Sequence, residues 1–235
     1  MLPKIIRSRR KTIALIVQAD GSVVVRAPQR VTNRQIAEIV EEKAEWIRSR
    51  QTQVQSRPKA EVHQFTSGEN FWYLGNPCRL LVTQGRQNRL EYSGWAFKLT
   101  VIPPSTLHLA DGKAEKERRA LGQALFTAWY RQQARQVLEE RVSRLAQQHG
   151  FSYRQVKITS ARTRWGSCSG RGTLSFPWRL VMAPLAVIDY VVVHELVHTV
   201  IKGHGADFWG QVQALAPQYK QHVSWLKENG GVLEV

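Results

Sequence analysis

The segment of residues 191–198, VVVHELVH, constrains the fold more than any other part of the sequence. Its apolar residues predict a helix in the core. On a helix, His194 and His198 lie four residues apart on one face, where two imidazoles can bind one metal ion. Glu195 points beside that face, so its carboxylate can take a proton from a metal-bound water without binding the metal. The pattern therefore predicts a zinc site on a buried helix.

A catalytic zinc ion takes three protein ligands and keeps one position open, so a third donor is required. His204 is the candidate. The helix is expected to end near Lys202 and Gly203, because glycine commonly follows a helix C-terminus and lysine suits its last turn. The chain can then turn and bring His204 back to the first two imidazoles. Gly205 is expected to begin another helix, with Asp207 in its first turn.

Other interpretations of these residues stay open. A single histidine on an apolar helix is more often a packed core residue than a ligand, but two at this spacing around a glutamate favour a metal site. Cys168 could complete the ligand set in place of His204, as in zinc amidohydrolases of the deformylase type. An isolated cysteine, however, is more often a small buried residue. His222, on the last predicted helix, is expected to be a packing residue.

The charge balance suggests a second class of function. Lys+Arg 34 against Asp+Glu 18 give a formal net charge of +16, which attracts nucleic acid, acidic proteins or anionic lipid. No nucleic-acid-binding motif accompanies the charge, and a solvated basic surface explains it equally well. The alternative to an enzyme is therefore a nucleic-acid-associated protein with a structural metal. In a mixed interpretation, the basic surface brings a peptidase to proteins on nucleic acid.

The cysteines and the N-terminus predict a cytoplasmic location. Cys78 and Cys168 are the two cysteines, far apart and without a secretory signal, so reduced thiols are expected. The first apolar run, residues 13–17, is too short for a signal peptide or a membrane span. The sequence leaves the oligomeric state open.

In the first half of the chain, short β-type runs surround one predicted helix. Asp20-Gly21 between the apolar runs 13–17 and 23–25 predicts an antiparallel hairpin. The pattern from Thr32 to Gln35 has the form of a capping box, and apolar residues at helical spacing follow it, so one helix is expected from residue 33 into the fifties. Further runs in residues 65–104 predict an antiparallel meander; they cover 71–74, 79–83 and 96–101.

The second half is expected to carry the metal site. Residues 111–149 predict one long helix, or two with a kink near 132–133. The predicted fold class is α+β: the metal helix, starting near Leu185, packs on a small mixed or antiparallel sheet, after a β-rich N-terminal region with one long helix, and the family resemblance described next implies that the domain is zincin-like. The predicted domains are 1–110 and 111–235. The other predicted elements are strands at 156–159 and 172–176, a turn at 164–168 and a last helix at 218–227.

The sequence resembles the YgjP-like metallopeptidases, a zincin-type family related in pattern to the SprT-like proteases. The resemblance extends over most of the chain, because the opening hairpin and the residues at 46–47, 73–75 and 129–130 also match. The motifs that carry it are RWGSC at 164–168, WRL at 178–180, Pro184, DYVVVHELVH at 189–198, His204 and FW at 208–209.

This resemblance implies a zinc peptidase with His194, His198 and His204 as metal ligands and Glu195 as catalytic base. The implied reaction is hydrolysis of peptide bonds in a protein or peptide substrate. Zinc (Zn2+) lowers the pKa of its bound water, and Glu195 removes the proton and later returns it to the leaving amine. Pro177 replaces an asparagine usual in the family, and Gly205 a serine.

Two further expectations concern the surroundings of the site. The strand at 172–176 precedes the metal helix and could pair with an extended substrate as an added strand. Asp189 and Tyr190 could assist the reaction, although core or capping roles account for them equally well.

Overall fold

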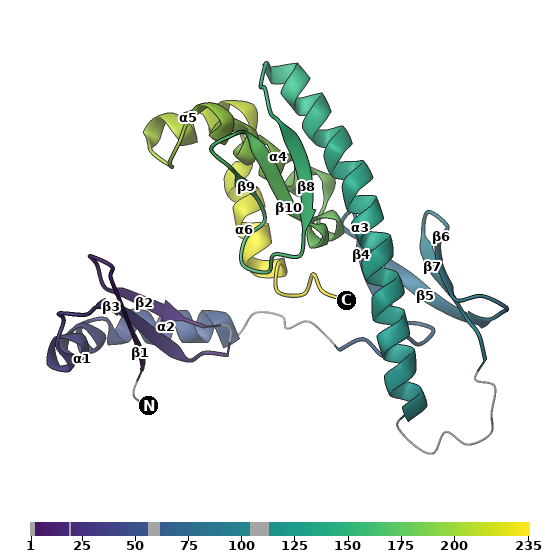
Figure 1. Cartoon of the computed structure of the whole chain (residues 1–235), viewed down its shortest axis with the longest axis horizontal. Helices are drawn as coiled ribbons and strands as arrows, with labels where there is room; N and C mark the ends of the chain where they lie inside the picture. The colour runs from purple at the N-terminus through teal and green to yellow at the C-terminus, as the bar shows by residue number, and fades with distance from the viewer. Residues whose placement is uncertain (1–2, 19, 56–61, 104–112) are drawn as a thin grey trace. The chain divides into compact units, whose positions relative to one another are not determined.

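The structure is a computed structural model and describes residues 3–18, 20–55, 62–103 and 113–235. The chain forms two compact units, Met1–Lys59 and Ala60–Val235 (Figure 1). The fold class is α+β, as predicted. The predicted boundary between residues 110 and 111 lies outside the described residues, and the contacts divide the chain elsewhere.

The first unit contains a three-stranded sheet in the order β1-β3-β2. β2 (Ala14–Val17) and β3 (Val23–Pro28) form the predicted antiparallel hairpin, with Val17 opposite Val23. The sequence analysis missed β1 (Lys4–Ser8), which pairs with β3 in parallel. All five of its residues are exposed, so its sequence lacks the alternation that marks a half-buried strand.

The predicted single helix after this sheet is wrong, because the structure has two helices that break at Lys43. They are α1 (Asn33–Glu42) and α2 (Ala44–Gln55). The capping box is present: the Gln35 amide donates to Thr32 Oγ1 at 3.2 Å, and the Thr32 amide donates to Gln35 Oε1 at 2.9 Å. α1 buries Ile36 in a small core with Val25 of β3 and Leu15 of β2, and α2 also contacts β2. Both helices therefore pack on the same sheet.

The second unit begins with a four-stranded sheet in the order β4-β5-β7-β6. The predicted antiparallel meander is wrong, because β5 and β7 are parallel. The analysis missed β6, which has few apolar residues and pairs with the far edge of β7. This hairpin places β7 beside β5 in the same direction. The strands are β4 (Asn70–Tyr73), β5 (Asn76–Gln84), β6 (Arg89–Tyr92) and β7 (Ala96–Val101).

A single long helix, α3 (Lys113–His149), lies between two sheets (Figure 1). One side of α3 packs an aromatic cluster against the four-stranded sheet. Phe126 stacks on Phe71 with ring centroids 4.0 Å apart, and Trp129 meets Phe97 edge-on at 4.8 Å. The Tyr130 hydroxyl donates to the Trp72 carbonyl at 2.6 Å. The sheet and the helix thus share one core with the rest of this unit.

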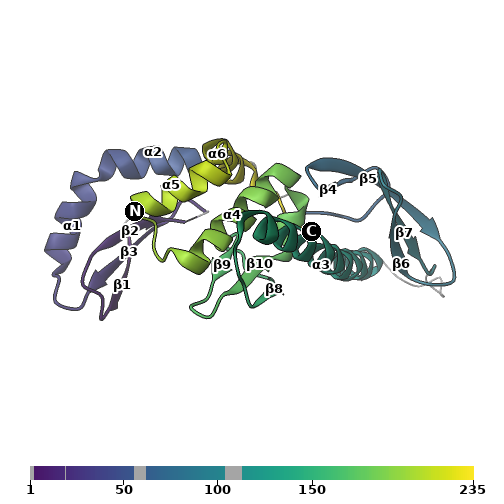
Figure 2. The ribbon, with the colours of Figure 1, turned by 90° about the horizontal axis from the view of Figure 1, so that it is seen from above.

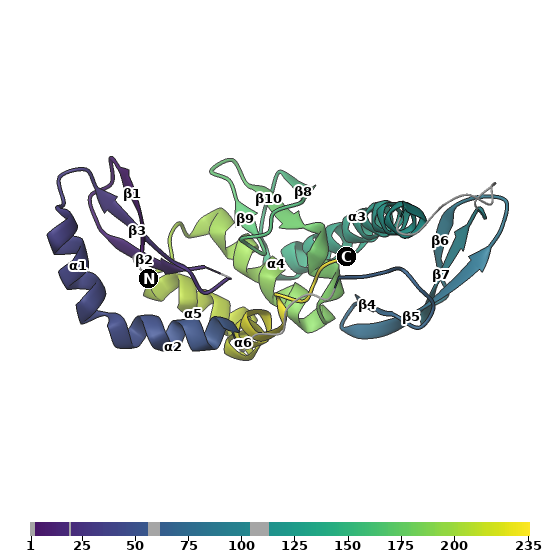
Figure 3. The same cartoon turned by 90° about the horizontal axis from the view of Figure 1, so that it is seen from below.

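The third sheet is small and mixed, in the order β8-β10-β9, and carries the metal helix α4 (Leu185–Val200), as predicted. β10 (Thr173–Pro177) is parallel to β8 (Gln155–Thr159) and antiparallel to β9 (Ser167–Cys168). Views from above and below show α4 between α3 and α6 (Figures 2 and 3). The remaining elements are the 3-10 helix η1 (Trp178–Met182), α5 (Ala206–Leu215) and α6 (Tyr219–Asn229). None of the described helices is long and apolar enough to cross a membrane.

Candidate metal centre

The helix α4 and the turn that follows it position the three predicted histidines. Most of α4 is apolar and buried, which anchors the helix in the core. It ends at Val200, slightly before the predicted Lys202-Gly203, and Gly203 adopts a left-handed φ of 83° in the following turn. α5 then begins after Gly205, with Asp207 in its first turn, as predicted. This turn carries His204 back toward α4.

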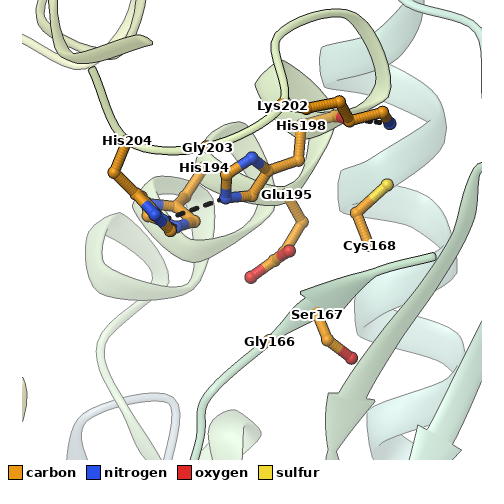
Figure 4. A pocket seen from close by; sticks show the side chains of 9 residues that line it. All are labelled: Gly166, Ser167, Cys168, His194, Glu195, His198, Lys202, Gly203 and His204. Atoms are coloured by element: carbon orange, nitrogen blue, oxygen red, sulfur yellow. Dashed lines mark hydrogen bonds between the residues drawn. The ribbon is translucent and has the colours of Figure 1, made fainter. Parts of the chain in front are cut away.

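The structure brings the three imidazoles together (Figure 4). His204 Nε2 lies 3.1 Å from His198 Nε2 and 3.2 Å from His194 Nε2. Two zinc–nitrogen bonds of about 2.0–2.1 Å at a tetrahedral angle separate their nitrogens by about 3.3 Å. The three Nε2 atoms therefore converge at the spacing that one metal ion requires. Within the described residues, no other group of three potential donor side chains is gathered in this way.

Phe208 fixes the three rings. It is fully buried and contacts each imidazole, with ring centroids 4.4 Å from His198, 4.8 Å from His204 and 4.9 Å from His194. His198 Nδ1 also lies 3.2 Å from the Ile201 carbonyl. A proton on this Nδ1 leaves the Nε2 lone pair free to bind a metal. Phe208, the first residue of the FW pair in the sequence motif, thus packs directly against the site.

The electrostatics favour the neutral form of two of the imidazoles. Burial, together with the nearby His198 and His204, lowers the pKa of His194 to about 4. Burial also lowers the pKa of His198. Neutral imidazole is the form that binds a metal, and three converging lone pairs are stabilised by a cation between them. The donor set therefore fits a divalent metal ion, with His194, His198 and His204 as the residues that could hold it.

Glu195 lies beside the histidines and is nearly inaccessible, with 5% of its surface exposed. Its Oε2 atom is buried and has no hydrogen-bond partner among the described residues. Burial raises the pKa of this carboxyl to about 7, against the opposing effect of the Arg164 charge. A carboxyl with this pKa can both accept and donate a proton near neutral pH.

Gly166 forms the wall behind Glu195, a role that the sequence analysis did not assign. A Cβ atom at this position would lie 2.6 Å from Glu195 Cγ and would overlap Oε1. Only glycine therefore allows the carboxylate its observed place. The available signal was the glycine inside the motif at residues 164–168, but its partner across the site could not be identified without the fold.

The site opens into a pocket of about 350 Å³ between β9 and α4. Cys168 lines this pocket, but the histidines form the group of gathered metal donors and Cys168 lies outside it. Burial raises the pKa of the Cys168 thiol, and the Lys202 charge acts in the opposite direction. The lining residues are Gly166, Ser167, Cys168, His194, Glu195, His198, Lys202, Gly203 and His204.

The other residues considered from the sequence lie around the site. Asp189 accepts hydrogen bonds from Arg141 and Arg144 of α3, so it joins two helices and does not line the pocket. Tyr190 is buried with its ring edge-on to His194, 6.0 Å between centroids, and burial raises its pKa to about 12. His222 lies 6.1 Å from the Tyr190 ring and outside the group of metal donors.

The expectation that the strand at 172–176 receives a substrate needs correction. This segment is β10, the central strand of its sheet, and both of its edges are paired. The edge strand next to the pocket is β9, whose two residues both line it. A strand pair with an extended ligand is therefore possible at β9 and not at β10.

A comparison with protein families shows which family the chain belongs to. A family model described as YgjP-like, metallopeptidase domain, matches residues 11–229. The chain belongs to the YgjP-like family. This membership confirms the resemblance seen in the sequence and supports a metallopeptidase that uses a divalent metal ion.

Two further comparisons were made. No curated protein matches the chain. Among solved structures, the chain is similar to the metallopeptidase zymogen of Pyrococcus abyssi abylysin, with 18% sequence identity and a TM-score of 0.32. That match covers 37% of this chain and 90% of the abylysin chain.

Proposed function

We propose that this protein is a zinc-dependent peptidase in which His194, His198 and His204 bind the zinc ion and Glu195 is the general base. The observation that carries the proposal is the convergence of three Nε2 atoms, 3.1 and 3.2 Å apart, beside a buried carboxylate. Membership of a metallopeptidase family supports the same function.

The chain's own residues supply the proton transfers. His194, His198 and His204 would hold the zinc ion, which would supply Lewis acidity for a peptide carbonyl and for water. Glu195 accepts a proton from the attacking water and returns it to the leaving amine. Gly166 holds the carboxylate in place from behind.

We propose that the substrate is an extended peptide that adds to the sheet beside β9. Among the described residues, β9 pairs with β10 alone, which leaves its other edge available. Backbone hydrogen bonds to an edge strand bind a peptide irrespective of its sequence, and pockets beside the strand select side chains. Both residues of β9 line the pocket that contains Glu195 and the histidines.

Metal content tests the ligand assignment. The purified protein is expected to contain about one zinc ion, measured by mass spectrometry. His204→Ala should lose most of it, and Cys168→Ala should keep it, because a zinc site needs three protein ligands. Zinc retained in His204→Ala and lost in Cys168→Ala would instead support a site of the deformylase type.

Cleavage of an unfolded protein tests the catalytic role of Glu195. Glu195→Gln is expected to keep its zinc and to lose activity by at least about a hundredfold, the usual contribution of a general base. Equal activity of the parent and Glu195→Gln would show that another residue or a contaminant is responsible.

Nucleic-acid binding and a cytoplasmic location stay predictions. Nucleic-acid binding is predicted from the net charge of +16. It can be measured as salt-dependent binding to DNA or RNA that Glu195→Gln leaves unchanged.

The cytoplasmic location is predicted from the two cysteines, Cys78 and Cys168, which are both free thiols in the structure.

A further inference from the structure

The pocket contains one positively charged residue that the proposed mechanism does not use. Of the residues that line the pocket, Glu195 and Lys202 are the two with ordinarily charged side chains, and Glu195 is assigned to proton transfer. Lys202 is exposed, and its Nζ donates to the His198 carbonyl at 2.5 Å. An ammonium group has three donors, so two remain. Among the described residues, no acidic side chain pairs with Lys202.

The segment of residues 160–172, which contains β9, adds positive charge. It carries Arg162, Arg164 and Arg171 and no acidic residue, and Arg162 pairs with Glu234 at 3.6 Å. Arg164 stands two residues before the lining segment that begins at Gly166. The charge of Lys202 acts on the Cys168 thiol in the same pocket. Positive charge at a cleft concentrates ligands of the opposite sign. The end of the pocket that holds Lys202 is therefore suited to a negatively charged ligand.

Lys202 lies at a defined end of the pocket. In Figure 4, Lys202 and Cys168 lie on one side of Glu195, and His194 and His204 lie on the other. A peptide beside β9 would pass Glu195 and then place a side chain next to Cys168 and Lys202. Cys168 contributes a small thiol to this end, which leaves the Lys202 ammonium as its charged group.

We propose that Lys202 and Cys168 form an acidic subsite, in which the Lys202 ammonium binds an aspartate or glutamate side chain next to the scissile bond. The substrates are then acidic peptide segments, and Lys202 determines specificity. This inference rests on the proposed peptidase function. It adds the chemical class of the substrate and the residue that selects it.

The hydrogen bond from Lys202 to the His198 carbonyl gives this lysine a second role, closing the C-terminus of α4. Two variants separate the roles. Lys202→Arg keeps the charge and a donor, whereas Lys202→Gln keeps a donor and removes the charge. Loss of specificity in Lys202→Gln together with its retention in Lys202→Arg therefore reports the charge and not the cap.

The test uses fluorogenic peptides that differ at one position beside the scissile bond, with glutamate, glutamine or lysine there. The parent protein is expected to cleave the glutamate peptide with a kcat/KM about fivefold above that of the glutamine peptide, the order of magnitude for one partly exposed charge pair. Lys202→Arg should keep this ratio, Lys202→Gln should bring it to about one, and Lys202→Glu should favour the lysine peptide. Added salt should reduce the parent's preference.

A matched control and a binding measurement complete the design. Lys157→Gln removes an exposed lysine from β8, the opposite edge strand of the same sheet, and should keep the parent's ratio. Binding of the same peptides to zinc-loaded Glu195→Gln, followed by fluorescence polarisation, should show the same order of affinity, and Lys202→Gln in that background should remove it.

The outcomes distinguish this inference from the proposed function. Cleavage of all the peptides at equal rates, or a preference for glutamate that persists in Lys202→Gln, overturns the acidic subsite and leaves the peptidase function intact. If the zinc-loaded parent cleaves neither these peptides nor unfolded proteins, the peptidase function itself is overturned.

Discussion

Gly166 and Glu195 lie against each other, which joins the edge of a sheet to a helix. The buried Glu195 carboxylate fills the space that a side chain at position 166 would occupy. The position of the Glu195 carboxylate, the proposed general base, thus depends on a residue almost thirty positions away in the sequence.

Gly166→Ala is expected to displace the Glu195 carboxylate, because the added Cβ would lie 2.6 Å from Cγ. A displacement of about 1 Å in a catalytic group lowers the rate by about a hundredfold. The kcat of the variant should therefore fall by about a hundredfold. The variant should keep its zinc, because the added Cβ does not contact the histidines. Gly170→Ala is the matched control, because a Cβ there meets no atom within 4 Å. Full activity of Gly166→Ala would contradict the assigned contact.

The raised pKa of Glu195 predicts a pH-dependent stability in the metal-free protein. The carboxyl has a pKa of about 7 in the folded chain against an ordinary value of 4.5. The folded state therefore holds the Glu195 proton more tightly than the unfolded state does. The stability that this proton contributes is complete below pH 4.5 and is lost as the pH rises through about 7. At about 1.4 kcal/mol per pKa unit, the difference reaches about 3 kcal/mol.

Glu195→Gln removes this titration. After treatment with a chelator, the variant should unfold at about the same temperature as the parent at pH 4.5 and several degrees above it at pH 8. Thermal unfolding followed by circular dichroism measures the difference. A gap between the two proteins that stays constant with pH would argue against a buried, ionisable Glu195.

At the scale of the elements, an ion pair joins the metal helix to the long helix. Arg141 Nε of α3 donates to Asp189 Oδ1 of α4 at 2.5 Å, and the two side chains are 14% and 25% exposed. The pair raises the pKa of Arg141 further, and Arg144 adds a weaker contact at 3.3 Å. Asp189 therefore holds α4 against α3.

Arg141→Met should lower the free energy of unfolding by about 2 kcal/mol, because it leaves the half-buried Asp189 carboxylate with a weaker partner. Arg135→Met, on the same helix, removes an exposed pair with Glu139 at 3.8 Å and should change stability by less than about 0.5 kcal/mol. Urea denaturation measures both. Equal effects of the two substitutions would show that the Arg141–Asp189 pair contributes no more to the free energy of unfolding than an exposed pair does.

At the scale of the whole molecule, the sheet β8-β10-β9 and the four-stranded sheet belong to one folding unit. α3 packs against both, and the aromatic cluster around Phe126 and Trp129 connects the four-stranded sheet to the common core. The unit Met1–Lys59 has a separate small core around Val25, Ala27 and Ile36.

Two fragments test this division. The fragment of residues 60–235 is expected to fold, to unfold cooperatively and to bind about one zinc ion, because it contains the whole core. The fragment 111–235 lacks the four-stranded sheet, exposes the aromatic side of α3 and should aggregate. Analytical size exclusion and metal content measure both properties. A monomeric, zinc-binding fragment 111–235 would support the boundary predicted from the sequence.

The sequence by itself determined the features that depend on neighbouring residues. The spacing of His194 and His198, the turn before His204, the hairpin at Asp20-Gly21 and the capping box at Thr32 are all encoded within a few positions. Helical periodicity and turn chemistry act over that range, so these elements appear in the structure where they were predicted.

The tertiary structure decided what depends on distant partners. The parallel pairing of β5 with β7, the exposed strand β1 and the central position of β10 follow from strand pairing, which local patterns do not specify. The break at Lys43 likewise appears only in the structure, because no glycine or proline marks it in the sequence. The contact of Gly166 with Glu195 has the same origin, because only the folded chain brings an edge strand against the metal helix.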